Sequence, residues 1–262
     1  MTEPSPAQPA FAPPDALATL VRDGTLDAEL AALLSLTAEG GIPLVVAGAD
    51  DVVRRAVRDA LLELVPPGRA VVRLAGADED FAWMPQAGEL GWRSAPRPAE
   101  PRPGAVMVAE FGDAATSGRT ETWGEAAHLA IRALTAGYSL MATIGGRRLE
   151  DVLASLGAPP VDASADELAR LGVVLVLAEP EPGTAPTVET AHYLRPVARD
   201  PGGHVQHPAP AVLATRSRAS GRFDHFAWGV TAELAARTGR RPIAFEREQA
   251  RRAAAVSAAA RG

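Results

Sequence analysis

Short apolar runs alternate along the chain with segments in which apolar residues recur every three or four positions. The runs predict five strands, at 42–47, 70–75, 105–109, 139–144 and 172–178, of which the first is expected to be buried. The periodic segments predict helices between these strands and two more before the first, at 15–24, 27–39, 51–64, 123–136 and 147–156. This strand-helix-strand order implies a parallel sheet with right-handed crossovers, and so an α/β fold with helices on both faces of the sheet.

The pattern changes beyond Glu179. Shorter strand-like segments follow, joined by Asp-Pro-Gly-Gly and Pro-rich links, at 187–197, 203–207 and 212–216. These links favour antiparallel hairpins. Helical spacing returns at 231–238 and again from Phe245 to the Ala/Arg-rich end.

These changes divide the chain into three predicted parts. Residues 1–14 are rich in Pro and small residues, which predicts a disordered arm without the basic-then-apolar order of a secretory signal. Residues 15–240 form the α/β core, with a hairpin-rich part at 180–220. Residues 241–262 form a helical tail.

Composition narrows the possible chemistry. A hydrophobic content of 47% is enough for an ordinary globular interior, and no apolar run is long enough to span a membrane. A net charge of -6 with dispersed arginines argues against a general nucleic-acid or anionic-membrane surface. The chain has no Cys, which excludes disulfides and thiolate metal sites. It also has no Lys, which excludes Schiff-base and lysine-dependent phosphate chemistry.

The first core strand runs into Gly48, where a phosphate-binding loop would begin. Such a loop reads G-x-x-x-x-G-K-[ST] between a buried strand and a helix, but these eight positions read Gly-Ala-Asp-Asp-Val-Val-Arg-Arg. Only the first Gly remains. Val53 replaces the second Gly, Arg54 replaces the Lys, and Arg55 replaces the hydroxyl residue that would hold magnesium.

The residues beside this degenerate loop favour loss of phosphate binding over its replacement by arginine. Asp50 and Asp51 stand at the start of the helix, where they cap its free N–H groups and repel a triphosphate. Arg54 and Arg55 each follow one of these carboxylates by four residues, a spacing suited to ion pairs. The free backbone N–H groups at the start of this helix are therefore expected to be bound by side chains of the chain itself.

The surrounding sequence resembles the type II/IV secretion and pilus-assembly ATPase family, especially its tight-adherence pilus branch. Residues 20–30 look like the lead-in helix pair of that family, and 42–65 align without a gap across its phosphate-loop strand and helix. Val106-Met-Val-Ala-Glu110 resembles the Walker B strand, and 125–153 resembles the helix, glycine turn and histidine-box strand. Gly221-Arg-Phe is similar to a C-terminal segment. The resemblance covers about residues 15–240.

The resemblance implies a RecA-like P-loop NTPase fold, with a mainly parallel sheet and antiparallel C-terminal hairpins. It makes Glu110 a remnant catalytic Walker B carboxylate, and Gly48, Arg54 and Arg55 the degenerate Walker A positions. The positions that differ from the family pattern are those that carry its chemistry. One of them is Gly145, which stands where the family has the histidine of its histidine box. A Pro-rich loop replaces the arginine-bearing helix before Walker B.

The first functional hypothesis is a pseudo-ATPase that acts as a binding, regulatory or structural subunit of a secretion or pilus assembly. It expects no cofactor. The alternative is weak ATP binding or hydrolysis, with Arg54 on phosphate and Glu110 on water or magnesium. A second alternative is an orphan scaffold outside any secretion system.

The resemblance also implies protein partners from a secretion or pilus machine, and a homo-oligomer or ring. The expected location is cytoplasmic and peripheral to an inner-membrane assembly, without nucleic acid and without direct membrane insertion.

Several residues have both a functional and a structural interpretation. Glu110 is also explained as a solvated strand end, and Thr143 as a buried strand residue. His204 and His207 lack a third ligand, so no metal site is expected. Asp224 and His225 lack the G-x-S-x-G elbow of a hydrolase. Two interpretations remain open for three tryptophans, which either cover the lost nucleotide pocket or form a surface that binds a partner: Trp83, Trp92 and Trp123.

Overall fold

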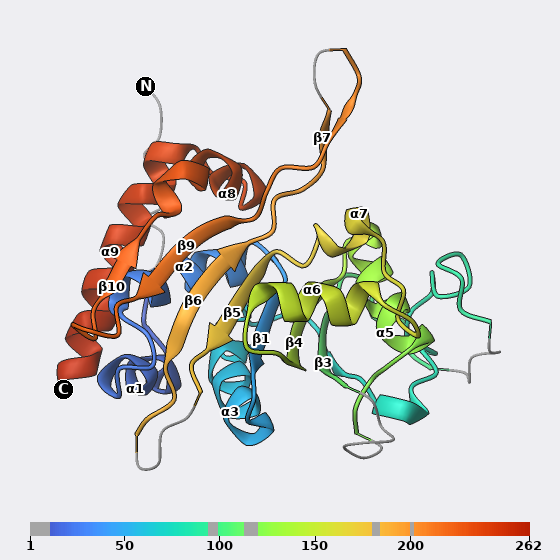
Figure 1. The fold of residues 1–262 in the computed structure, drawn as a ribbon, viewed down its shortest axis with the longest axis horizontal. Coiled ribbons are helices and arrows are strands. Elements are labelled where there is room, and N and C mark those ends of the chain that lie inside the picture. The colour runs from blue at the N-terminus through green and yellow to red at the C-terminus, as the bar shows by residue number, and fades with distance from the viewer. Residues whose placement is uncertain (1–10, 94–98, 113–119, 180–183, 200–201) are drawn as a thin grey trace.

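A computed structural model of the protein describes residues 11–93, 99–112, 120–179, 184–199 and 202–262. Within these residues the core is an eight-stranded sheet with the order β10-β9-β6-β5-β1-β4-β3-β2 (Figure 1). Its strands are β1 (Leu44–Gly48), β2 (Val71–Arg73), β3 (Val106–Phe111), β4 (Ser139–Gly145), β5 (Val173–Leu177), β6 (Val188–Tyr193), β9 (Ala211–Arg216) and β10 (Phe223–His225). Residues 1–10, most of the predicted arm, lie outside the described residues.

One half of the sheet is parallel and comprises β5, β1, β4, β3 and β2. In β1, Val46 lies opposite Thr143 of β4 on one side and Leu175 of β5 on the other. Every residue of β1 and β5 is buried, which explains why these strands read as continuous apolar runs. Because the strands are parallel, their carboxyl ends meet at one edge, where ligands bind in open α/β sheets. The loop after Gly48 lies at this edge.

The other half is antiparallel. β6 pairs with β5 and β9, and β9 pairs with the edge strand β10. The short strands β7 (Ala198–Arg199) and β8 (Val205–Gln206) form a separate hairpin that projects from the body of the molecule (Figure 1). The change from parallel to antiparallel pairing after β5 agrees with the change of pattern at Glu179.

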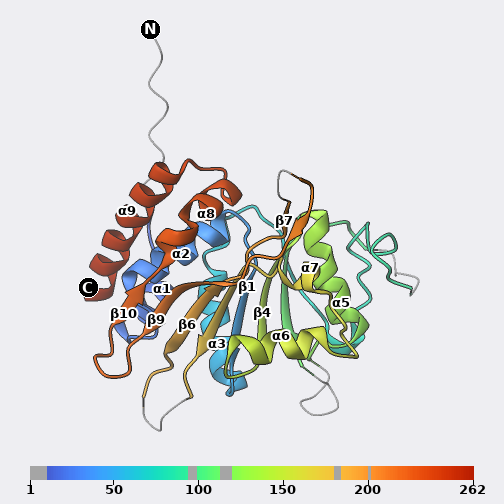
Figure 2. The same cartoon turned by 45° about the horizontal axis from the view of Figure 1, so that its top comes forward.

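Helices cover both faces of the sheet, as predicted (Figure 2). Leu44 and Val46 belong to a core shared with α1 (Asp15–Arg22), α2 (Ala28–Glu39), α3 (Asp51–Leu62), α8 (Thr231–Arg237) and α9 (Pro242–Arg261). Val45 and Ala47 belong to a second core with α5 (Glu125–Arg132) and α6 (Leu149–Gly157), beside which lies the short α7 (Ala165–Leu168). Three 3₁₀ turns complete the described elements: η1 (Gly76–Asp78), η2 (Ala133–Ala136) and η3 (Ala227–Val230).

The C-terminal helix α9 is joined to α2 by a buried arginine. Arg252 forms an ion pair with Glu39, donates a hydrogen bond to the Ser35 hydroxyl at 3.2 Å, and contacts Glu248 at 2.7 Å. Arg240 binds the other oxygen of Glu39 at 2.6 Å. The predicted helical tail is therefore packed against the body of the molecule.

An Arg252→Ala variant is expected to lose about 2 kcal/mol of unfolding free energy, because charge-assisted hydrogen bonds in a buried position are lost together. Arg251→Ala is the matched control. Arg251 is exposed and binds the same Glu248, so its removal should cost less than about 1 kcal/mol. Urea unfolding of both variants measures the difference, and equal losses would contradict a special role for the buried arginine.

Candidate functional site

The loop after β1 is capped by its own aspartate. The Asp50 carboxylate accepts a hydrogen bond from the Val53 backbone N–H at 3.0 Å, so it is the N-cap of α3. The predicted capping is thus present at Asp50. Since a phosphate would need the free N–H groups at this helix start, the carboxylate competes with it directly.

Arg54 turns back onto the loop instead of pointing toward solvent. Its guanidinium donates a hydrogen bond from Nη1 to the Gly48 carbonyl oxygen at 2.5 Å, and only 7% of the residue is exposed. The expected ion pair with Asp50 is therefore replaced by a backbone contact. Burial lowers the pKa of Arg54, and the nearby carboxylates of Asp51 and Glu121 oppose this shift.

Two further arginines of α3 hold the Glu110 carboxylate. Arg55 Nη1 lies 3.1 Å from Glu110 Oε2, and Arg55 Nη2 lies 2.5 Å from Asp51 Oδ2, the predicted ion pair four residues earlier. Arg58 Nη1 lies 3.5 Å from Glu110 Oε1. The hydrogen bond to Glu110 raises the pKa of Arg55. Both oxygens of Glu110 are thus engaged by guanidinium groups.

This geometry changes the interpretation of Glu110. Its side chain is 21% exposed, so it is not the freely solvated strand end that the sequence allowed. A carboxylate that activates water needs an oxygen free to accept a proton, whereas both oxygens of Glu110 are engaged by guanidinium groups. In this conformation Glu110 links β3 to α3 through its ion pairs with Arg55 and Arg58.

Arg58 is a site residue that the sequence interpretation missed. It is 2% exposed, and its guanidinium also contacts the Ala109 carbonyl at 3.4 Å and Asp59 at 3.0 Å. A signal was present, because Arg58 lies on the buried face of α3, between Val57 and Leu61. Arginine on an apolar helix face requires a buried partner.

Glu121 is a second missed residue. It is buried, and its carboxyl group lies where a side chain at Gly112 would begin, within 2.8 Å of the position of a Cβ atom there. The neighbouring Thr122 donates its backbone N–H to the Glu110 carbonyl at 2.6 Å. No local pattern reveals this arrangement, because it depends on the chain returning beside β3.

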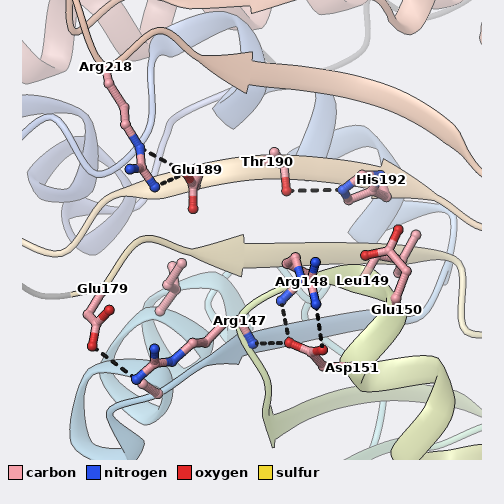
Figure 3. Close-up of a pocket in the computed structure, with 12 residues that line it drawn as sticks. Arg147, Arg148, Leu149, Glu150, Asp151, Glu179, Glu189, Thr190, His192 and Arg218 are labelled. Atoms are coloured by element: carbon pink, nitrogen blue, oxygen red, sulfur yellow. Dashed lines mark hydrogen bonds and ion pairs between the residues drawn. The ribbon is translucent and has the colours of Figure 1, made fainter.

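A cavity of about 640 Å³ lies beside the loop, bordered by Ala49, the start of α6 and the ends of β5 and β6 (Figure 3). Arg147 binds Glu179 at 3.0 Å, and Arg218 binds Glu189 through Nε at 3.0 Å. Each arginine that lines the cavity contacts a carboxylate, since Arg148 lies 3.7 Å from Asp151. The cavity therefore offers no surplus of positive charge to a triphosphate.

The inner wall of the cavity carries His192. Its Nε2 lies 3.0 Å from the Thr190 hydroxyl (Figure 3). Burial lowers the pKa of His192, and the charge of Glu150 opposes this effect. The imidazole is consequently neutral at neutral pH and adds no positive charge to the cavity.

The tryptophans lie away from the loop. Trp83 and Trp92 pack around Phe81 with ring centroids 6.2 and 5.0 Å apart, and Trp83 also meets Tyr138 at 5.8 Å. These rings, and the half-buried Trp123, belong to the core that contains α5. Trp83 is thus a core residue, whereas Trp92 is partly buried, and the two functional interpretations of the tryptophans stay predictions.

The remaining candidates have structural explanations. Thr143 is buried in β4, as predicted. Within the described residues, no group of three or more His, Cys, Asp or Glu side chains could hold a metal ion, and this includes the neighbourhood of His204 and His207.

His225 contacts α2 instead of forming a hydrolase site with Asp224. Its Nε2 lies 2.7 Å from Asp27 Oδ2, and its Nδ1 lies 3.8 Å from Glu29 Oε1.

The His225 contact predicts a pH dependence of stability. Burial lowers the pKa of His225, but the hydrogen bond to Asp27 and the charges of Asp27, Glu29 and Asp224 raise it overall. A raised folded-state pKa stabilises the fold below the unfolded value of about 6.5, and this contribution disappears as pH rises through the folded-state pKa. The stability advantage of the wild type over His225→Gln should therefore shrink between about pH 6 and pH 8. Urea unfolding across this range measures it, and a constant difference would contradict the prediction.

Comparisons with known proteins show a weak similarity to solved structures. No family model matches the chain, and no curated protein matches its sequence. Among solved structures, the chain is similar to the VirB11 ATPase from the Brucella suis type IV secretion system in complex with sulphate, with a TM-score of 0.43 and 14% sequence identity. The match covers 73% of this chain and 60% of that one. Neither family nor activity follows from similarity at this level.

Proposed function

We propose that the protein is a pseudo-ATPase of the secretion and pilus ATPase type, related to the tight-adherence branch, and that it binds no nucleotide. The observation that carries this proposal is the position of Arg54, whose guanidinium is bound to the Gly48 carbonyl where a phosphate loop would receive its ligand. The proposed role is a binding, regulatory or structural subunit of a secretion or pilus assembly.

The contacts of the loop support this proposal physically. A phosphate loop offers backbone N–H groups to an anion, whereas here Asp50 has taken the Val53 N–H and places a negative charge beside it. Glu110, the remnant Walker B position, is held by Arg55 and Arg58. ATP binding would require Arg54 to leave Gly48 and the Asp50 carboxylate to leave the helix start.

Titration of the full chain with magnesium and ATP tests the proposal. Isothermal calorimetry should show no binding at millimolar ATP, and thermal unfolding should be unchanged. A ligand at about 100 times its Kd would stabilise the fold by about 2.7 kcal/mol, which is easily seen. Binding near millimolar or tighter that Glu110→Gln abolishes would overturn the proposal and support the weak-ATPase alternative with Arg54 on phosphate.

The partner and location parts of the proposal rest on the sequence resemblance. We infer protein partners from a secretion or pilus machine, a cytoplasmic position peripheral to an inner-membrane assembly, and self-association or insertion into a ring of a partner. Mass measurement in solution tests self-association. Co-purification with an active secretion ATPase would support the assembly role, and its absence under conditions that retain that machine favours the orphan scaffold.

A further inference from the structure

Positive charge is concentrated at the C-terminal end of the chain. Residues 211–262 carry ten arginines and four carboxylates, whereas residues 1–210 carry sixteen arginines and 28 carboxylates. The net charge of -6 therefore conceals a basic part of the molecule, built from β9, β10, η3, α8 and α9. Such an excess of arginine attracts an anionic surface.

The same part of the molecule exposes three large apolar side chains, of which Phe226 is 43% exposed. Trp228 of η3 is 80% exposed and Ile243 of α9 is 59% exposed. Trp228, Ala232 and Ala236 are all exposed and lie four residues apart, which places them along one side of η3 and α8. Ile243 lies in the first turn of α9, shortly after α8 ends. Exposed apolar side chains that gather in one part of a surface are typical of an interaction site.

Two arginines within four residues of Ile243, at the start of α9, have no carboxylate partner among the described residues. Arg241 and Arg247 are exposed and form no ion pair within the part of the chain that the structure describes, in contrast to Arg251 and Arg252, which bind Glu248. We call this surface the α8–α9 surface and define it by six residues: Trp228, Ala232, Ala236, Arg241, Ile243 and Arg247. Figure 2 shows α8 and α9 side by side at one end of the molecule.

We propose that the α8–α9 surface adsorbs to an anionic lipid bilayer. Trp228 and Ile243 enter the headgroup region, and Arg241 and Arg247 contact the lipid phosphates. The ring of tryptophan is amphipathic and partitions to this depth, while arginine binds phosphate oxygens with two parallel hydrogen bonds. The charge of the surface favours an anionic lipid bilayer as the occupant, because Arg241 and Arg247 are exposed and form no ion pair among the described residues.

The arrangement favours adsorption without crossing. No helix among the described residues is long and apolar enough to span a membrane. Interfacial binding instead combines a modest apolar area with basic charge, and it weakens as salt screens the charge. The surface is separate from the loop after Gly48, so this proposal stands or fails independently of nucleotide binding.

Flotation of the full chain with vesicles tests the proposal. Binding is expected to vesicles that contain phosphatidylglycerol, with little binding to pure phosphatidylcholine and a loss at high salt. Each arginine near an anionic surface contributes about fivefold in affinity, so the Arg241→Ala, Arg247→Ala double variant should bind more than about tenfold more weakly. Trp228→Ser should also lose binding. Val52→Ser is the control, because Val52 is an apolar residue on α3 that is 64% exposed, and it should bind as the wild type does.

Tryptophan fluorescence gives a second readout. Of the four tryptophans, Trp228 is the exposed one, so brominated phosphatidylglycerol should quench wild-type fluorescence and leave that of Trp228→Phe unquenched. Three outcomes would overturn the proposal. They are no binding to phosphatidylglycerol vesicles, binding unaffected by the Trp228 and arginine variants, and a Trp228-dependent self-association in sedimentation without lipid binding, which would make a second copy the occupant.

Discussion

An Arg58→Ala variant is expected to lose about 3 kcal/mol of unfolding free energy. Arg58 is 2% exposed and is among the largest fully buried side chains of the described protein. Its removal leaves a cavity under α3 and takes one of two guanidinium groups from Glu110, while the Ala109 carbonyl loses a donor. Each change is destabilising, because buried polar groups without partners cost free energy.

The matched control for Arg58 is Arg73→Ala. Arg73 is exposed and contacts the same Asp59 at 3.4 Å, so its removal should change stability by less than about 0.5 kcal/mol. Urea unfolding of both variants at neutral pH is the measurement. If Arg58→Ala were as stable as Arg73→Ala, the Glu110 cluster would contribute nothing to the fold, and its description as a structural tie between β3 and α3 would be wrong.

Gly172→Ala is expected to lose about 3 kcal/mol or more. Gly172 precedes β5 with φ of +70°, and a Cβ atom there would lie 2.5 Å from the Pro43 carbonyl oxygen and 2.7 Å from Ile42 Cγ2. The left-handed conformation costs about 1 to 2 kcal/mol for a residue with a side chain. The clash adds to this cost, because the contacted atom is backbone held in the sheet and Val173 donates to the same carbonyl at 2.9 Å.

Gly24→Ala isolates the conformational part of this effect. Gly24 has φ of +76° and no atom within 4 Å of an added Cβ, so its variant should lose only about 1 kcal/mol. Thermal or urea unfolding of the two variants separates the clash from the conformation. A Gly172→Ala loss no larger than that of Gly24→Ala would show that β1 and β5 can move apart freely at this point.

Much of the fold was predictable because its main signals are local. The apolar runs that end at Gly48 and Leu177 are buried on both sides of a parallel sheet, whereas the similar run at 70–75 forms the exposed edge strand β2. Asp50 was also predictable as a cap, since its side chain bonds to a backbone group only three residues away.

The contacts at the site were less accessible to sequence reasoning. Spacing along a helix correctly predicted the Asp51–Arg55 pair but chose the wrong acceptor for Arg54, which binds the Gly48 carbonyl. The spacing rule for ion pairs on a helix surface assumes that every arginine is solvated, whereas Arg54 and Arg58 are buried. The position of Glu121 follows from tertiary contact alone, and no periodicity encodes it.

The tryptophans are a second case in which the sequence did not predict the position of a side chain in the fold. Trp83 and Trp92 fall in a Gly- and Pro-rich stretch, which the sequence marks as loop and therefore as surface. In the fold the aromatic residues of this stretch pack into the core that contains α5, where Trp83 contacts Tyr138. Trp228, in contrast, precedes a regular helix and is the residue left outside.

The packing of α9 against α1 and α2 also determines the order in which the protein can be completed during synthesis. Helix α2 is buried over nine consecutive residues, and α9, the last twenty-residue helix before Gly262, contacts it directly. On the ribosome α1 and α2 are therefore made long before α9, and the apolar surface of α2 stays uncovered until α9 leaves the exit tunnel. During this interval α2 is open to other nascent chains and to chaperones.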